Sequence, residues 1–154
     1  MANKVIVVGG GAAGMMAALS ARYHGADVMI LERNDRIGKK LLATGNGRCN
    51  YTNKYLTINN YHGNNPKFAY SALSQFDVDM TIEFFERLGI TPALEENGKV
   101  FPLSFQASSI LDVLRYEIEE KGIEVITEAY VVDIVKRKRF IISLKRSEER
   151  RVGK

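Results

Sequence analysis

Apolar residues in the first thirty positions follow the order strand, helix, strand. Residues 4–8 (KVIVV) form a continuous apolar run, as in strands that are buried on both faces. Small and apolar residues then recur at helical spacing over residues 12–23, and Gly25 follows as a helix stop. Residues 28–31 form a second short apolar run. The pattern predicts a right-handed βαβ unit with parallel strands.

The periodicity is lost between residues 33 and 66, where Gly, Asn, Lys, Tyr and Thr dominate. We expect a long loop here, and loops of this length inside a compact domain are usually functional or disordered. Regular patterns return with DVDMTIEFFERLG, which predicts a helix that Asp77 or Asp79 caps. The dipeptide Asn97-Gly98 predicts a hairpin with a type I′ turn. The other predicted elements are a helix within residues 106–122, a strand at 123–127, and two strands about a basic turn within 129–145.

The composition is that of an ordinary soluble globular protein, with 154 residues of which 45% are hydrophobic and 26% charged. The single cysteine rules out a disulfide framework, and two histidines leave little for a zinc site, so we expect no metal. We find neither a membrane span nor a secretory signal in the sequence. The expected location is the reducing cytoplasm.

The last nine residues, RSEERRVGK, match the translation of a common sequencing-adapter read. We therefore expect a domain over residues 1–145 and a non-native tail at 146–154; a genuine charged tail is the alternative. Without the tail's four basic and two acidic residues, the 22 basic and 18 acidic residues of the chain become 18 and 16, a net charge of +2. At that charge the basic composition says little about partners, and we expect no nucleic acid and no membrane among them.

A glycine motif stands between the first predicted strand and helix. Gly9, Gly11 and Gly14, with Ala12 and Ala13 between the last two, fit G-x-G-x-x-G. The first glycine allows a tight turn, the second lets a pyrophosphate approach the backbone, and the third lets helix and strand pack closely. The helix N-terminus supplies free N–H groups for phosphates. The motif in this context predicts a dinucleotide site.

The acidic residue that completes such a site is Glu32, which ends the second predicted strand, 18 residues after Gly14. A carboxylate at this spacing accepts hydrogen bonds from a ribose and disfavours a 2′-phosphate, which leaves NAD and FAD. Some ninety residues separate Glu32 from the predicted strand that starts at Ile123. That delay favours FAD, whose longer contacts draw on inserted loops.

The pairing of VVGGGAAGMMAA…LER with IGKKLLATGNGRCNYTN, and then GKVFPLSFQAS, resembles the FAD-dependent oxidoreductases of the aminoacetone oxidase or BaiN-like family. The resemblance runs from about Lys4 to Lys145. It implies an α/β fold: a Rossmann-like FAD-binding domain of the glutathione-reductase type, with a parallel sheet and a β-meander of which only two strands are present here. It also implies a longer enzyme, of which this chain is an N-terminal fragment that is inactive alone. The implied activity is hydride or electron transfer through FAD, linked to NAD(P)H, on a small-molecule substrate.

The resemblance places the loop Gly45–Asn53 beside the FAD. Glycines in that loop permit close backbone approach, and its polar side chains offer donors to phosphate or to the flavin edge. The residues so assigned to the cofactor are Gly45, Asn46, Gly47, Arg48 and Asn50, together with Arg33, Lys39, Lys40 and Val131. For Lys39 and Lys40 the alternative is that they are solvated surface lysines. Val131 matches a position whose backbone contacts the adenine in related flavoproteins.

No residue of the chain is a convincing catalytic acid or base. Cys49 lacks a second cysteine for disulfide chemistry and partners for a metal, so we interpret it as a packed side chain. His24 and His62 are more typical of structural and surface-loop histidines. The alternative function is a non-catalytic dinucleotide-binding module.

Overall fold

The computed structural model describes residues 3–145 of the chain, so the predicted tail at 146–154 lies outside the described residues. The described chain forms two compact units. The first consists of residues 3–39 and 118–145, and the second of residues 40–117. The α-helix α4 (Ala107–Glu120) starts in the second unit and ends in the first.

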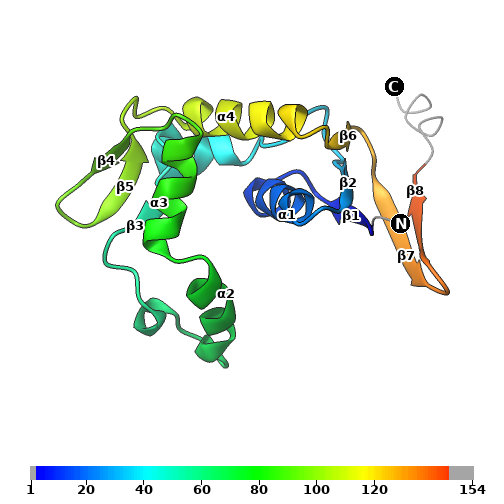
Figure 1. Cartoon of the computed structure of the whole chain (residues 1–154), viewed down its shortest axis with the longest axis horizontal. Coiled ribbons are helices and arrows are strands. Elements are labelled where there is room, and N and C mark those ends of the chain that lie inside the picture. Colours follow the sequence, from blue (N-terminus) through cyan, green and yellow to red (C-terminus); the bar gives the residue numbers. More distant parts are fainter. Residues whose placement is uncertain (1–2, 146–154) are drawn as a thin grey trace, which may run out of the picture. The chain divides into compact units, whose positions relative to one another are not determined.

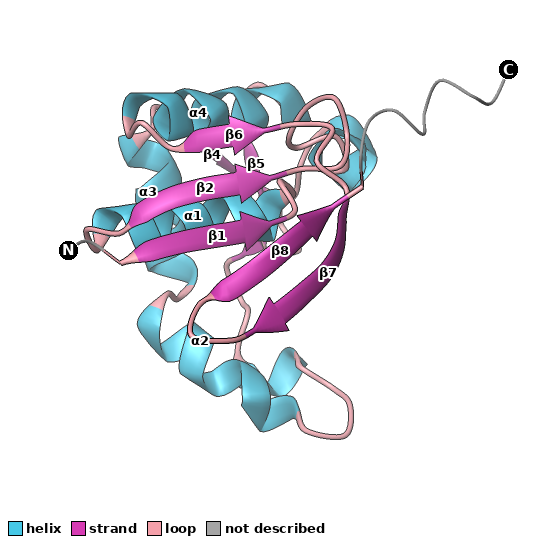
Figure 2. Cartoon of the chain, turned by 90° about the vertical axis from the view of Figure 1, so that its right-hand side faces the viewer, coloured by secondary structure: helices cyan, strands magenta, loops and turns pink. Residues whose placement is uncertain are grey.

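The first unit is built on a parallel sheet, as predicted (Figure 2). Its order is β1 (Lys4–Val8), β2 (Asp27–Leu31) and β6 (Glu124–Ile126), so β2 lies in the centre. The helix α1 (Ala12–Tyr23) connects β1 to β2, and its Met15, Ala18 and Leu19 are fully buried. The predicted βαβ unit is therefore confirmed, and it carries the glycine motif at the carboxyl end of β1. The prediction that this strand is buried on both faces is wrong, because Ile6 and Val8 on one face are 37% and 48% exposed and line an open groove.

An antiparallel hairpin completes the first unit. Its strands β7 (Val131–Lys136) and β8 (Phe140–Leu144) confirm the two strands predicted about the basic turn. Among the described residues they form a two-stranded sheet of their own. A groove of about 760 Å³ lies between β1 and this hairpin, lined by Ile6, Val8 and Phe140 among others.

The second unit contains a small antiparallel sheet in the order β3 (Thr52–Asn53), β5 (Lys99–Pro102) and β4 (Pro92–Leu94). The unit also contains short helical segments and two α-helices besides α4, of which α2 lies away from the sheet beyond α3 (Figure 1). These are the 3-10 segments η1 (Leu41–Gly47), η2 (Ile58–Asn60) and η3 (Pro66–Ala69), and the α-helices α2 (Tyr70–Gln75) and α3 (Val78–Arg87). The segment predicted as a loop, residues 33–66, contains only 3-10 segments and the two-residue strand β3. The sequence did not predict α2, because six residues carry too little periodicity.

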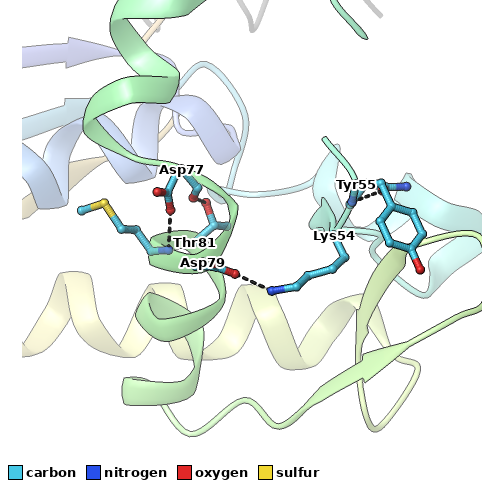
Figure 3. Close-up of polar contacts among 7 residues, drawn as sticks. Lys54, Tyr55, Asp77, Asp79 and Thr81 are labelled. Atoms are coloured by element: carbon cyan, nitrogen blue, oxygen red, sulfur yellow. Dashed lines mark hydrogen bonds and ion pairs between the residues drawn. The ribbon is translucent and has the colours of Figure 1, made fainter. Parts of the chain in front are cut away.

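The start of α3 is held by several polar contacts (Figure 3). The Asp77 carboxylate accepts a hydrogen bond from the backbone N–H of Met80 at 2.9 Å, so Asp77, one of the two predicted candidates, is the N-cap. The hydroxyl of Thr81 donates to the Asp77 carbonyl at 2.7 Å. Asp79, in the first helical turn, forms an exposed ion pair with Lys54.

The hairpin of β4 and β5 confirms the prediction from Asn97-Gly98, but the predicted type I′ turn is wrong. Type I′ needs positive φ at both central residues. Gly98 has φ +81°, whereas Asn97 is not among the described residues with positive φ. The Gly98 N–H donates to the Glu95 carbonyl at 2.8 Å, and the Glu95 N–H donates to the Lys99 carbonyl at 2.9 Å. The loop is thus longer than two residues, and a single left-handed glycine closes it.

Aromatic packing forms the core of the second unit. Phe84 and Phe85 on α3 are buried, with their ring centroids 5.2 Å apart in an edge-to-face arrangement. Val100 and Phe101 on β5 are 1% exposed. The hydrophobic face of α3 therefore places its aromatic residues inside, as its period predicts.

None of the helices in the described part of the chain combines the length and the apolar character that crossing a membrane requires.

Candidate functional site

The glycine motif forms a tight turn between β1 and α1. Gly9 has φ +102°, and its N–H donates to the carbonyl of Leu31 at 2.7 Å, which ties the turn to β2. A Cβ atom on Gly14 would lie 1.9 Å from the Gly9 carbonyl oxygen. The absence of that atom is what allows α1 to pack against the end of β1.

Glu32 is fixed beside this turn by hydrogen bonds to both of its carboxylate oxygens. Oε2 accepts from the backbone N–H of Gly10 at 2.7 Å, and Oε1 accepts from the backbone N–H of Asn34 at 2.8 Å and from the Asn34 side-chain amide. The side chain is only 6% exposed. Burial raises the pKa of Glu32, but the hydrogen bonds from Asn34 and Gly10 outweigh it, so the pKa lies below its ordinary value. Glu32 is an anion held in place at the carboxyl end of β2.

The surroundings of the turn fit the phosphates of a dinucleotide. Apart from adjacent backbone, no described atom lies within 4 Å of the positions that a Cβ would take on Gly9 or Gly11, so the backbone there faces open space. Gly11 is the N-cap of α1, the N-terminus has no side-chain cap, and the first turn carries no acidic residue. The first N–H groups of α1, on Ala12 and Ala13 and beyond, are therefore available to an anion.

The basic residues assigned to the cofactor in the first unit are more peripheral. Arg33 and Lys39 are both exposed, and Lys39 forms an ion pair with Asp35 at 2.6 Å. Lys40, at the start of the second unit, is exposed as well. Val131 is closer to the site, because the segment before it runs along the end of β2: the N–H of Ala129 donates to the Glu32 carbonyl at 2.8 Å.

The second unit holds the other predicted cofactor residues on one loop at the end of η1. Four residues of this loop have left-handed backbone conformations: Gly45, Asn46, Gly47 and Cys49, with φ of 54°, 55°, 80° and 59°. A Cβ on Gly45 would lie 2.8 Å from the backbone nitrogen of Asn50, so the loop turns back on itself at this glycine. The Cys49 N–H donates to the Thr44 carbonyl at 3.0 Å and closes the loop.

Two polar side chains of this loop are already engaged within the unit. Arg48 Nη1 lies 2.9 Å from Glu95 Oε1, and its guanidinium carbon lies 4.3 Å from the centre of the Phe101 ring. The Asn50 amide, in the orientation that satisfies both of its polar atoms, donates to the carbonyls of Thr52 at 2.7 Å and Val100 at 3.2 Å. Sequence reasoning did not find Glu95 or Phe101, because no local pattern links residues some fifty positions apart.

Cys49 has the environment of a packed thiol. It is 5% exposed, and burial raises the pKa of its thiol, although a hydrogen bond with Thr44 works against this. Burial also raises the pKa of the neighbouring Tyr51 to about 12, with smaller contributions from Glu86 and Cys49. A thiol with a raised pKa is a poor nucleophile at neutral pH. No group of three or more His, Cys, Asp or Glu side chains within residues 3–145 is arranged to hold a metal ion.

The fold and the glycine turn with its fixed carboxylate define a Rossmann-type dinucleotide-binding domain. The chain belongs to the HI0933-like family, since the model described as "HI0933-like protein Rossmann domain" matches residues 3–153. This confirms the family resemblance and the fold class predicted from the sequence. The family is one of flavin-dependent oxidoreductases, and the Rossmann domain is its FAD-binding part.

Three comparisons illustrate the relationship. The chain is 42% identical over 127 residues to the 3-dehydro-bile acid delta(4,6)-reductase of Clostridium scindens, covering 81% of this chain and 31% of that protein. It is 32% identical over 131 residues to the ribosomal RNA dihydrouridine synthase of Escherichia coli K12, covering 85% of this chain and 32% of that protein. The structure of the 3-ketosteroid-delta4-(5alpha)-dehydrogenase of Rhodococcus jostii RHA1 superposes with a TM-score of 0.60 at 16% identity, over 94% of this chain and 42% of that one. The chain thus spans about a third of the length of the curated relatives.

Proposed function

We propose that the full-length protein is a flavin-dependent reductase that adds hydrogen across a C=C bond conjugated to a carbonyl group. The names of the two relatives described above indicate such a reaction: one reduces a 3-oxo bile acid, and the other converts uridine in RNA to dihydrouridine. FAD, when bound, supplies the hydride transfer between donor and substrate. The higher identity to the bile acid reductase supports a small-molecule substrate. NADH or NADPH is the electron donor in this proposal.

The residues of this chain bind and orient the cofactor in that proposal. The glycine turn and the N-terminus of α1 receive the diphosphate, and Glu32 receives the ribose of the adenosine. The single observation that carries this assignment is the fixed Glu32 carboxylate, which lies in hydrogen-bonding contact with Gly10 in the middle of the glycine motif. The family resemblance assigns Gly45, Asn46, Gly47 and the backbone of Val131 to the same cofactor, and this assignment is part of the proposal. A cytoplasmic location, which the single cysteine favours, is part of the proposal.

The test is the full-length protein, expressed and purified with its own flavin. We expect the flavin released on denaturation to be FAD, and its visible absorption to be bleached anaerobically by NADH or NADPH. Reoxidation is then followed with a 3-oxo-4,6-diene steroid acid and, separately, with a uridine-containing RNA. Reoxidation by the steroid acid supports the proposal. Reoxidation by the RNA alone would replace the small molecule by RNA as substrate, and bound FAD that no nicotinamide reduces would favour the non-catalytic module.

A further inference from the structure

Arg48 is the only arginine of the second unit's left-handed loop. Its surroundings differ from those expected of an arginine whose guanidinium is available to bind a phosphate. Its charge is already paired with Glu95, with 2.9 Å between Arg48 Nη1 and Glu95 Oε1. Its guanidinium also lies over the Phe101 ring. A guanidinium with a carboxylate on its edge and an aromatic ring on its face has two of its preferred partners at once.

Both partners belong to the hairpin of β4 and β5, not to the loop that carries Arg48. Glu95 directly follows β4, and Phe101 lies within β5. Phe101 is 1% exposed and cannot move without opening the core of the unit. Arg48 therefore connects a strained loop to a rigid element.

The loop touches Phe101 at a second point. A Cβ on Gly45 would lie 3.3 Å from Cε1 of Phe101, so the left-handed backbone at Gly45 packs closely on the same ring. Gly45 and Arg48 are joined by a hydrogen bond from the Arg48 N–H to the Gly45 carbonyl at 3.1 Å. The ring thus supports both ends of the Gly45–Arg48 turn, and the ion pair with Glu95 fixes the side on which Arg48 lies.

We infer that Arg48 is a positioning residue for the loop Gly45–Asn53. Paired with Glu95 and stacked on Phe101, it holds the Gly45–Asn46–Gly47 backbone in its left-handed conformation. The cofactor then meets the backbone of this loop, and the guanidinium does not bind the diphosphate directly. The sequence indicated that Arg48 donates hydrogen bonds to phosphate or to the flavin edge, and the inferred positioning role replaces that assignment. The inference rests on the proposed function to the extent that it places this loop beside FAD.

The two roles predict opposite effects of a change at Glu95. If Arg48 bound the diphosphate, Glu95→Gln would release the guanidinium and leave the affinity for FAD unchanged or higher. If Arg48 positions the loop, Glu95→Gln loosens the loop and lowers the affinity, as Arg48→Gln does. The two substitutions remove the same contact, so the double variant should be no weaker than the more damaging single one.

The experiment measures the dissociation constant of FAD for the full-length protein and its Arg48→Gln, Glu95→Gln and double variants, at a temperature well below unfolding. We expect Glu95→Gln to weaken FAD binding by about threefold, the range of a part-exposed ion pair, and Arg48→Gln, which also removes the cation–π contact, by up to about tenfold. Both variants should change the visible circular dichroism of the flavin. Asp79→Asn, which breaks the exposed ion pair with Lys54 in the same unit, is the matched control and should leave both readouts unchanged.

The outcomes separate this inference from the proposed function. A wild-type protein without FAD would overturn the proposed function. A wild-type holoprotein whose Glu95→Gln variant binds FAD as tightly as before, or more tightly, would overturn the inference alone. If Arg48→Gln does not fold, Glu95→Gln still decides, because it leaves the guanidinium stacked on Phe101.

Discussion

A Cβ atom on Gly14 would lie 1.9 Å from the carbonyl oxygen of Gly9. This relationship shows what the third glycine of the motif does: it sets the closest approach of α1 to the end of β1. Because the clash is with backbone and not with a flexible side chain, the helix would have to move as a whole. We expect Gly14→Ala to lower the free energy of unfolding of the full-length protein by about 3 kcal/mol, a typical cost of an overpacked contact. Urea denaturation followed by circular dichroism measures this, and an unchanged midpoint would contradict the close packing.

The second glycine should behave differently, since Gly11 has open space where its Cβ would be, among the described atoms, and a φ of −77° that alanine adopts readily. We expect Gly11→Ala to lower the free energy of unfolding of the apoprotein by about 1 kcal/mol at most, because alanine is a poorer N-cap than glycine. The new methyl group would occupy the space of the pyrophosphate, so FAD affinity should fall by at least about tenfold.

Equilibrium dialysis or the recovery of flavin absorption on titrating apoprotein with FAD measures this loss. The larger side chain of Gly11→Val should abolish flavin retention on purification. A yellow holoprotein from the valine variant would remove the glycine turn from the cofactor site. Gly14→Ala serves as the contrasting variant, because it acts first on folding.

The sequence predicted what depends on short-range pattern. The strands β1 and β2 and the helix α1 are read from neighbouring residues, and the structure confirms them. The N-cap of α3 was predicted at Asp77 or Asp79, and the structure shows that it is Asp77. The left-handed conformation of Asn46 and Cys49 and the contacts of Arg48 were not predicted. These features depend on which distant residues pack against the loop. In the sequence, only Gly45 and Gly47 indicated tight turns there.

The site shows the same division. The glycine motif and Glu32 have a fixed spacing that follows from the βαβ unit, so their proximity could be predicted. Asn34, which binds the Glu32 carboxylate with both its backbone and its side chain, had no such signal, because an Asn after a strand is common in any turn. Glu95 lies on a hairpin that was predicted, but its ion pair with Arg48 was not predicted.

Glu32 makes stability depend on pH in the acid range. Its pKa is lower in the folded protein than the ordinary value of 4.5, because its hydrogen bonds favour the carboxylate. The stabilisation is therefore fully present above pH 4.5 and is lost as the pH falls through the folded pKa. We expect Glu32→Gln to lower the free energy of unfolding by about 1–2 kcal/mol at neutral pH, since a buried N–H then loses a charged acceptor.

The check is urea denaturation of wild type and Glu32→Gln at neutral pH and again below the pKa of the carboxylate. The difference between the two proteins should shrink at the lower pH. A difference that stays constant over this range would show that the Glu32 carboxylate is not what stabilises the turn. Asp35→Asn, at an exposed ion pair three residues further on, is the matched control.

Tyr51 provides a prediction at the other end of the pH scale. Its ring packs against Phe85 with centroids 4.9 Å apart, and its hydroxyl is buried without a hydrogen-bond partner among the described residues. An unpartnered buried hydroxyl is a cost, so Tyr51→Phe should leave the free energy of unfolding unchanged or raise it by up to about 1 kcal/mol. The pKa of Tyr51 is raised to about 12, so the neutral phenol is favoured in the folded state. Wild-type stability should consequently decline as the pH rises from 10 towards 12, and the decline should be smaller in Tyr51→Phe. Thermal denaturation of both proteins between pH 10 and 12 measures this difference in pH dependence. A clear loss of stability in Tyr51→Phe at neutral pH would show that the hydroxyl has a partner in the full-length protein.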